Sequence, residues 1–162
     1  MPLAYLGLGS NLSDPAGQVR RALGAIAALP ASRLAAASRL YRSPPLGPQD
    51  QPDYINAVAA LETTLTPRDL LHALQTIEHD FGRVRLRRWG ERVIDLDVLL
   101  YDDLCLDSPE LTLPHPGIGE RAFVLCPLAE LAPDLIIPGL GPLADLLAAR
   151  ATDTCEPLEE AA

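Results

Sequence analysis

Apolar and polar positions alternate along residues 94–101, which predicts a β-strand with two different faces. The period of two places Ile94, Leu96, Val98 and Leu100 on one face and Asp95, Asp97, Leu99 and Tyr101 on the other. Next-but-one residues of a strand are neighbours, so the two carboxylates stand together, and their like charges repel unless a cation lies between them. The pattern predicts a divalent metal site, although an Asp-x-Asp strand taken alone is more often a solvated face.

The remaining apolar pattern predicts strands that alternate with helices. Short apolar runs predict strands at residues 3–9, 35–41 and 54–65, and helical spacing predicts helices over residues 15–29 and 67–81. Asp14 and Thr66 each precede a proline and can cap these helices. Gly7 and Gly9 are interpreted as part of a turn, because the further residues of a phosphate-binding glycine loop are missing.

This order of elements, βαββαβ, predicts an α+β fold of the ferredoxin-like kind. We expect a four-stranded antiparallel sheet with helices packed on one face, so that the open face carries the ligands. Extra helices are expected near the C-terminus, over residues 121–131 and 143–150. The length of 162 residues fits a single domain, 1–162, in which about 151–162 form a frayed tail.

Arginines crowd the segment directly before the predicted acidic strand. They are Arg83, Arg85, Arg87, Arg88 and Arg92, and Gly90 among them favours a loop. Planar guanidinium groups bind phosphate oxygens through bidentate hydrogen bonds. Mg²⁺ prefers carboxylate and phosphate oxygens as ligands. Either feature alone could be an ordinary surface, but together they predict a site for a metal-bound nucleotide phosphate.

The composition narrows the class of protein and its compartment. A formal net charge of −9 disfavours nucleic acid or a membrane surface as partner, because proteins that bind these usually carry a broad basic face. The three cysteines are far apart and form no Cys-x-x-Cys pair, which fits a reducing compartment. The N-terminus has neither a basic region nor a long apolar run, so a cytoplasmic enzyme is expected.

A rigid loop and two rings outside this region could also take part in binding. Residues 44–52 hold four prolines and a glycine, which stiffen the backbone and suit the recognition of a flat heterocycle, although a plain connector fits equally well. Tyr54 and Asn56 share a strand face and offer a stacking surface beside a hydrogen-bonding group. His115 lies between two prolines, where a phosphate contact and a structural role are both open.

Several of these stretches together resemble the 6-hydroxymethyl-7,8-dihydropterin pyrophosphokinase family of folate biosynthesis. The resemblance runs from residue 4 to about residue 150 and is carried by RWGERVIDLDVL at 88–99, YRSPPLG at 41–47, PDYINA at 52–57 and LPHP at 113–116. It implies transfer of pyrophosphate from ATP to the hydroxymethyl group of the pterin, with release of AMP. Small-molecule substrates and a monomer are expected.

The resemblance also implies roles for individual residues. Asp95 and Asp97 would hold two Mg²⁺ ions, and Arg83 and Arg92 would stabilise the charge that develops during transfer. The ATP site would be lined by Gln75, Glu78, Arg85, Arg88, Trp89, Val98, Thr112, His115 and Arg121. The pterin would lie between Tyr54 and Phe123, with Asn56 and the backbone of Ser43, Pro44 and Leu46 reading its edge.

Two departures from the family and two other classes of function are relevant. Some members have arginine in place of Glu110 and tyrosine in place of Pro116.

Another Mg²⁺-dependent phosphoryl or nucleotidyl transferase could use the same carboxylates on a different acceptor. A regulatory module that binds a small ligand could also have the βαββαβ pattern, but such a module would not need Asp95 and Asp97.

Overall fold

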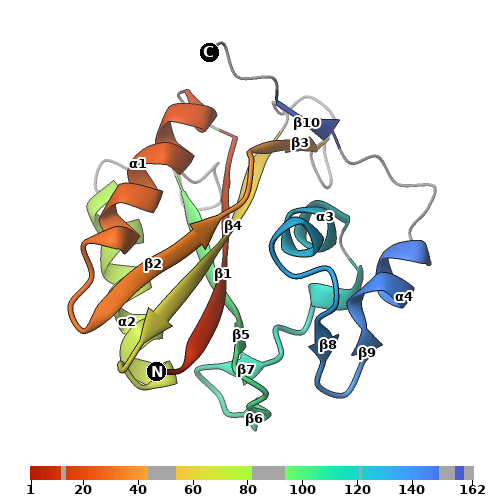
Figure 1. The fold of residues 1–162 in the computed structure, drawn as a ribbon. Helices are drawn as coiled ribbons and strands as arrows, with labels where there is room; N and C mark the ends of the chain where they lie inside the picture. Colours follow the sequence, from red (N-terminus) through yellow and green to blue (C-terminus); the bar gives the residue numbers. More distant parts are fainter. Residues whose placement is uncertain (12–13, 44–53, 82–93, 121, 150–155, 159–162) are drawn as a thin grey trace.

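The computed structural model describes residues 1–11, 14–43, 54–81, 94–120, 122–149 and 156–158. It is a mixed α+β structure in which helices lie on both sides of an antiparallel sheet (Figure 1). The principal strands are β1 (Leu3–Ser10), β2 (Ser32–Ala37), β3 (Tyr41–Ser43), β4 (Tyr54–Thr63), β5 (Asp95–Tyr101) and β10 (Glu156–Pro157). The helices are α1 (Pro15–Ala27), α2 (Pro67–Phe81), η1 (Ile118–Glu120), α3 (Ala122–Leu131) and α4 (Leu143–Ala148). Two short hairpins complete the list, β6 (Leu106–Asp107) with β7 (Thr112–Leu113) and β8 (Ile136–Ile137) with β9 (Gly141–Pro142).

Among the described residues the main sheet has six strands, not the four expected. Its order is β10-β3-β4-β1-β5, and β2 also pairs with β4. The strand predicted at residues 35–41 is in fact parts of two strands, β2 and β3, with a break over residues 38–40. The Ser38 hydroxyl accepts a hydrogen bond from Val58 N–H at 2.9 Å, and a side chain thus takes up one ladder bond at the break.

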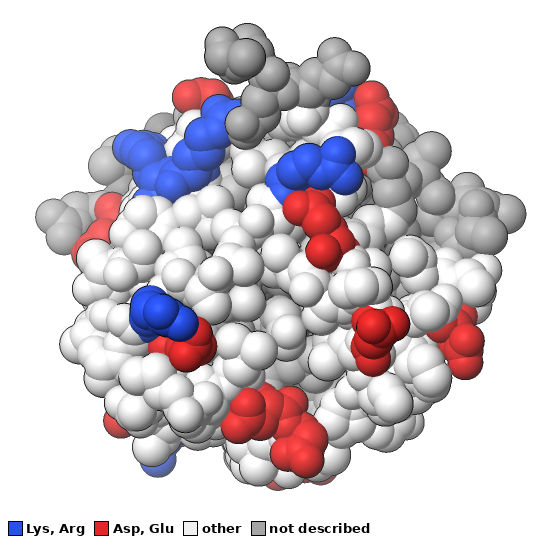
Figure 2. All heavy atoms as spheres, in the orientation of Figure 1, with Lys and Arg blue, Asp and Glu red and all other residues white. Residues whose placement is uncertain are grey.

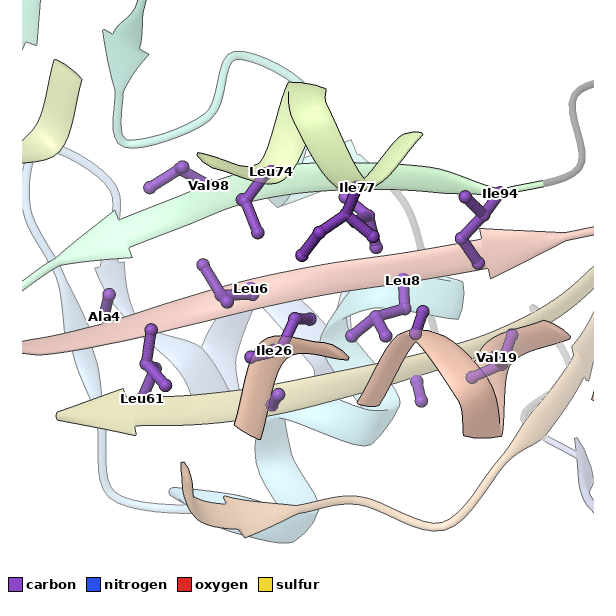
Figure 3. Packing of buried hydrophobic residues seen from close by; sticks show 14 of the residues in the cluster. Ala4, Leu6, Leu8, Val19, Ile26, Leu61, Leu74, Ile77, Ile94 and Val98 are labelled. Carbon is purple, nitrogen blue, oxygen red and sulfur yellow. The ribbon is translucent and has the colours of Figure 1, made fainter. Parts of the chain in front are cut away.

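One face of the sheet is covered by α1 and α2, which enclose the larger core. Leu6 and Leu8 of β1 and Val98 of β5 pack against Val19 and Ile26 of α1 and Leu74 and Ile77 of α2 (Figure 3). Both helices begin where the sequence predicts, because the Asp14 carboxylate accepts from Gly17 N–H and the Thr66 hydroxyl accepts from Asp69 N–H.

The expectation that helices pack on only one face is wrong. The opposite face of the sheet is partly covered by α3, α4 and the β8–β9 hairpin, which form a second core (Figure 1). Val58, Leu99 and Leu100 on the sheet pack there against Leu125 and Leu128 of α3. The short apolar runs of the C-terminal third bury themselves in this way, because they have no other apolar surface to cover.

The alternation predicted for residues 94–101 holds only as far as Leu99. A register shift in the pairing with β1, between Tyr5 and Leu6, turns the end of β5 over. Leu99 and Leu100 both belong to the α3 side, and Tyr101 instead joins the core under α2, where its hydroxyl donates to Leu65 O at 2.6 Å. A bulge of one residue reverses every later side chain, so the predicted face of Leu100 and Tyr101 is wrong.

The C-terminal segment is not wholly frayed, in contrast to the expectation. Glu156 and Pro157 of β10 pair with Arg42 and Tyr41 of β3, and Leu158 N–H donates to Leu40 O at 2.8 Å. The outer edge of β3 offers free backbone groups, which explains why a short segment adds there.

Cys105 is an exposed free thiol, whereas Cys126 takes part in a disulfide bond, contrary to the expectation of reduced cysteines. None of the described helices is both long enough and apolar enough to cross a membrane.

Candidate active site

The two carboxylates of β5 lie together on the face opposite α1 and α2, as predicted. Asp95 and Asp97 stand across from Gly9 and Gly7 of β1, while Ile94 before them and Leu96 between them are buried on the other face. Asp95 is half-buried and the side chain of Asp97 is 52% exposed. The pair is therefore anchored from behind by buried neighbours and remains accessible from the front.

Glycines of β1 form the floor beside these carboxylates. Gly7 and Gly9 lie inside the strand, so their interpretation as part of a turn is wrong. A side chain at residue 9 would begin 2.9 Å from Asn56 Oδ1, and directly opposite residues put Asn56, Gly9 and Asp95 in one row across three strands. Glycine in the middle of a strand typically marks a close approach of another group, and sequence reasoning missed this signal.

Glu78 joins helix α2 to the acidic strand. Its Oε2 atom accepts a hydrogen bond from Leu96 N–H at 2.8 Å, from the residue between Asp95 and Asp97. Because β5 ends the sheet, its outward N–H groups have no neighbouring strand, and Glu78 satisfies one of them. The predicted ATP-site residue thus fixes the backbone on which both carboxylates stand.

His115 is brought to the same place by the segment after β7. Its backbone N–H donates to Leu99 O at 2.9 Å, and its Nδ1 accepts from Gly117 N–H at 3.1 Å. In the neutral ring the proton must then be on Nε2, which lies 3.8 Å from Asp97 Oδ1. A donor and a carboxylate that face each other in this way can share a ligand such as a metal-bound phosphate.

The other residues predicted for the ATP side lie around β5 and α2. Thr112 is half-buried on β7, Gln75 is exposed on α2, and Val98 is 2% exposed in the core under α2. Only the backbone of Val98 is therefore open to a ligand contact. The sequence places Val98 on β5. Its side chain lies on the face opposite Asp97, so it cannot contact a ligand bound there.

Glu110, where the chain departs from some family members, holds the hairpin β6–β7 to helix α2. Its two carboxylate oxygens contact Arg68 Nη2 at 2.8 Å and His72 Nε2 at 3.1 Å. All three side chains are exposed, so each contact alone adds little to stability. Their effect is positional, because the segment that follows Glu110 carries Thr112 and His115.

On the other side of Gly9, Asn56 is held by β3. Asn56 is 6% exposed, and its Nδ2 donates to Ser43 Oγ at 2.8 Å. Tyr54 begins β4 two residues earlier, on the same face and opposite Ser43. Ser43 was predicted to act through its backbone, but here its hydroxyl orients the amide of Asn56. The structure thus brings together the three described residues predicted to bind a heterocycle.

Several predicted site residues lie outside the described part of the chain. They are Arg83, Arg85, Arg88, Trp89, Arg92, Arg121, Pro44 and Leu46, so their placement in the site stays a prediction. Residue 123 lies in the first turn of α3, but the side chain of Phe123 is likewise outside the description.

The described residues suit a metal only together with a ligand that supplies further oxygens. No group of three or more His, Cys, Asp or Glu side chains in the described ranges is arranged to hold an ion. Two adjacent carboxylates provide the hard oxygen donors that Mg²⁺ takes beside phosphate oxygens. On the face shown in Figure 2 the described basic side chains form small separate groups, most of them beside acidic ones.

Comparison with known proteins matches the chain to one enzyme family. Residues 5–133 match the model of the family described as 7,8-dihydro-6-hydroxymethylpterin-pyrophosphokinase. A 2-amino-4-hydroxy-6-hydroxymethyldihydropteridine pyrophosphokinase of Pseudomonas aeruginosa is 56% identical over 145 residues, which is 90% of each chain. The enzyme of the same name from Haemophilus influenzae is 54% identical over 138 residues, which is 85% of this chain and 86% of the relative.

Solved structures show a similar fold within longer chains. An HPPK-DHPS chain crystallised in complex with substrates has a TM-score of 0.73 at 11% identity, over 94% of this chain and 46% of that one. The wild-type Plasmodium falciparum HPPK-DHPS with pteroate has a TM-score of 0.70 at 14% identity, over 93% of this chain and 42% of that one. The chain spans less than half the length of these two structures, and the likeness at such identities concerns the fold alone.

Proposed function

Because the chain belongs to the 7,8-dihydro-6-hydroxymethylpterin-pyrophosphokinase family and transfers pyrophosphate from ATP to the hydroxymethyldihydropterin of folate synthesis, we propose that Asp95 and Asp97 hold the nucleotide. The observation that carries this proposal is their position side by side on an open face, with His115 Nε2 3.8 Å from Asp97.

The donor set suits Mg²⁺, and we assign two ions to Asp95 and Asp97 together with the triphosphate oxygens. When bound, Mg²⁺ supplies charge neutralisation at the phosphates that react. The chain's own contribution is rigidity. Buried Ile94 and Leu96 hold the strand, and the hydrogen bond from Leu96 N–H to Glu78 keeps both carboxylates from shifting along its edge.

The ATP side is completed by residues around β5 and by the arginine segment. His115 offers its Nε2–H to a phosphate oxygen next to Asp97, and Thr112 lies on β7, the hairpin strand just before His115. Gln75 and Glu78 border the edge of β5 from α2. Beyond the described residues we assign phosphate and nucleotide contacts to Arg83, Arg85, Arg88, Trp89, Arg92 and Arg121, of which Arg83 and Arg92 stabilise the developing charge.

The pterin side is built from Ser43, Tyr54 and Asn56. The amide of Asn56, fixed by Ser43, can read the edge of a flat heterocycle, and the Tyr54 ring offers a surface on which that heterocycle stacks. We assign the opposite stacking surface to Phe123 and further backbone contacts to Pro44 and Leu46. A buried polar group of fixed orientation selects its ligand strongly, because a ligand that lacks the matching atom leaves it unpaired.

The reaction follows from the spacing of these two sides. Asn56 and Asp95 are two strands apart, which is about 10 Å at ordinary strand spacing, with only Gly9 between them. A pterin held at Asn56 can direct its hydroxymethyl oxygen across β1 to the β-phosphorus of ATP. The new oxygen–phosphorus bond forms as the bond from that phosphorus to the α-phosphate oxygen breaks, AMP leaves, and the hydroxyl proton passes to solvent. Positioning of this kind replaces a bimolecular encounter.

The test is AMP formation from ATP, Mg²⁺ and hydroxymethyldihydropterin. We expect Asp95→Ala and Asp97→Ala to lower kcat at least a thousandfold with unchanged circular dichroism, because each removes an oxygen ligand of the nucleotide's metal. Asp103→Ala, an exposed aspartate in the turn after β5, is the matched control and should keep full activity. Activity in both site variants within tenfold of the unaltered protein would contradict the assignment.

Two broader assignments belong to the same proposal. The order of the elements supports a ferredoxin-like description of the core. It is β1, α1, then β2 and β3 in place of one strand, then β4, α2 and β5. We also propose a single domain over residues 1–162 that works as a monomer in the cytoplasm. Elution of the protein at twice its mass of 17.4 kDa in size-exclusion chromatography would contradict the monomer.

A further inference from the structure

Glu130 near the end of α3 binds Tyr41, the first residue of β3, and Arg39, two residues before it. Its Oε2 accepts from the backbone N–H of Arg39 at 3.0 Å, and its Oε1 accepts from Arg39 Nε at 3.1 Å and from the Tyr41 hydroxyl at 2.6 Å. Both carboxylate oxygens are thus engaged, and one helix side chain holds a strand through backbone and side-chain donors at once. We call Arg39, Tyr41 and Glu130 the Glu130 clamp.

The three members of the clamp also support one another. Arg39 Nη2 lies 3.4 Å from the Tyr41 hydroxyl, and the Arg39 guanidinium lies 5.8 Å from the centre of the Tyr41 ring. Burial alone would raise the pKa of Glu130, but the hydrogen bonds from Tyr41 and Arg39 outweigh it and keep this pKa below its ordinary value. Tyr41 is 6% exposed and packs against Cys126 of α3, so its hydroxyl has a fixed position.

The clamp joins the two elements that border the proposed pterin site. Tyr41 lies directly opposite Asn56 in the sheet, and Ser43, which orients Asn56, follows two residues later on the same strand. On the helix, residue 123 comes seven residues, or about two turns, before Glu130 and therefore lies on the same side of α3. A shift of β3 against α3 would alter the position of Asn56 relative to residue 123.

We propose that the Glu130 clamp positions the pterin side of the active site by holding β3 against α3. This inference rests on the proposed function. The three members of the clamp are positioning residues that do not touch the substrate. The carboxylates of β5 are held separately, by β1 and by Glu78. Loosening the clamp therefore weakens pterin binding and leaves the ATP side as it is.

An ion pair elsewhere in the sheet provides a matched control. Arg33 of β2 forms an ion pair with Glu62 of β4, and the Arg33 side chain is 73% exposed. Like the clamp, this pair joins an arginine to a glutamate. This pair joins two neighbouring strands at the end of the sheet away from Asn56. Glu62→Gln removes a charge of the same kind without touching β3 or α3.

The experiment compares Tyr41→Phe, Glu130→Gln and Glu62→Gln with the unaltered protein. Steady-state AMP formation gives kcat and both KM values, and fluorescence titration gives pterin binding in the presence of a non-hydrolysable ATP analogue and Mg²⁺. For Tyr41→Phe and Glu130→Gln we expect about a tenfold rise in the pterin KM and Kd, the size of one lost charge-assisted hydrogen bond. The KM for ATP and kcat should stay within twofold, and Glu62→Gln should change nothing by more than twofold.

Tyr41→Phe is the decisive variant. It keeps the buried ring, so we expect it to fold even if Glu130→Gln does not. A pterin KM within twofold of the unaltered value in Tyr41→Phe would overturn the clamp, and so would an equal rise in both KM values, which indicates general loosening. Absence of AMP formation by the unaltered protein would overturn the proposed function and the clamp together, whereas AMP formation with unchanged pterin KM overturns the clamp alone.

Discussion

The Nε2 atom of His115 lies 3.8 Å from Oδ1 of Asp97, although the two residues are 18 positions apart in the chain. The orientation of the ring is set by its other nitrogen, because Nδ1 accepts the N–H of Gly117 at 3.1 Å. A histidine fixed in this way presents one N–H to the carboxylate side of the site. Its contribution can therefore be divided between the two ring nitrogens.

His115→Gln and His115→Asn should have unequal effects on ATP binding. Glutamine can place an N–H near the position of Nε2, whereas asparagine can accept from Gly117 but cannot reach toward Asp97. We expect the KM for ATP to rise about tenfold in His115→Asn and less in His115→Gln, with the pterin KM within twofold in both. Equal KM values for ATP in the two variants would show that the Nε2 proton has no part in binding.

Gly9→Ala should weaken pterin binding more than Gly7→Ala does. A Cβ at residue 9 would lie 2.9 Å from Asn56 Oδ1, and Asn56 cannot turn freely because Ser43 holds its other amide atom. At residue 7 the atoms nearest to a Cβ are Leu99 side-chain atoms, at 3.4–3.5 Å. We expect the pterin KM to rise about tenfold in Gly9→Ala and to stay within twofold in Gly7→Ala. A reversed order would place the substrate elsewhere on β1.

The two glycines of α1 should respond differently to alanine in a thermal unfolding experiment. Gly24 is exposed with open space around it, so Gly24→Ala should add about 0.5–1 kcal/mol through helix propensity, or about 1–4 °C in Tm. A Cβ at residue 17 would lie 2.2 Å from Asp14 Oδ2, so Gly17→Ala displaces the capping carboxylate, which costs about 1 kcal/mol. Gly17→Ala should therefore not raise Tm. An equal gain in both variants would show that the cap adjusts without loss.

Stability should depend on Glu130 at neutral pH but not in acid. The hydrogen bonds from Tyr41 and Arg39 lower the pKa of Glu130, so its contribution is present above the unfolded-state pKa of about 4.3 and is lost as the pH falls through the folded value. We expect Glu130→Gln to lower Tm by about 2–4 °C at pH 7, because about 1 kcal/mol is lost. The difference from the unaltered protein should shrink as the pH falls below about 4. A constant difference across that range would exclude the charge as its cause.

Local patterns in the sequence determined helices α1 and α2 and the acidic centre of the site. The caps at Asp14 and Thr66 and the period of two at residues 94–99 depend on near neighbours, so they could be predicted without the fold. The pairing of Asp95 with Asp97 belongs to this class, because residues two apart on a regular strand share a face and the bulge of β5 lies beyond them. The motifs from residue 41 to residue 116 carried the family resemblance for the same reason.

Only the tertiary structure decided which distant groups meet. The bulge that turns Tyr101 into the α2 core arises from pairing with β1, and the second layer of helices arises because the C-terminal apolar runs need a sheet face to cover. The row from Asn56 through Gly9 to Asp95 is a matter of register between strands, and the hydrogen bonds of Glu130 to Arg39 and Tyr41 span about 90 residues. Such contacts depend on packing between elements, which no local pattern of residues encodes.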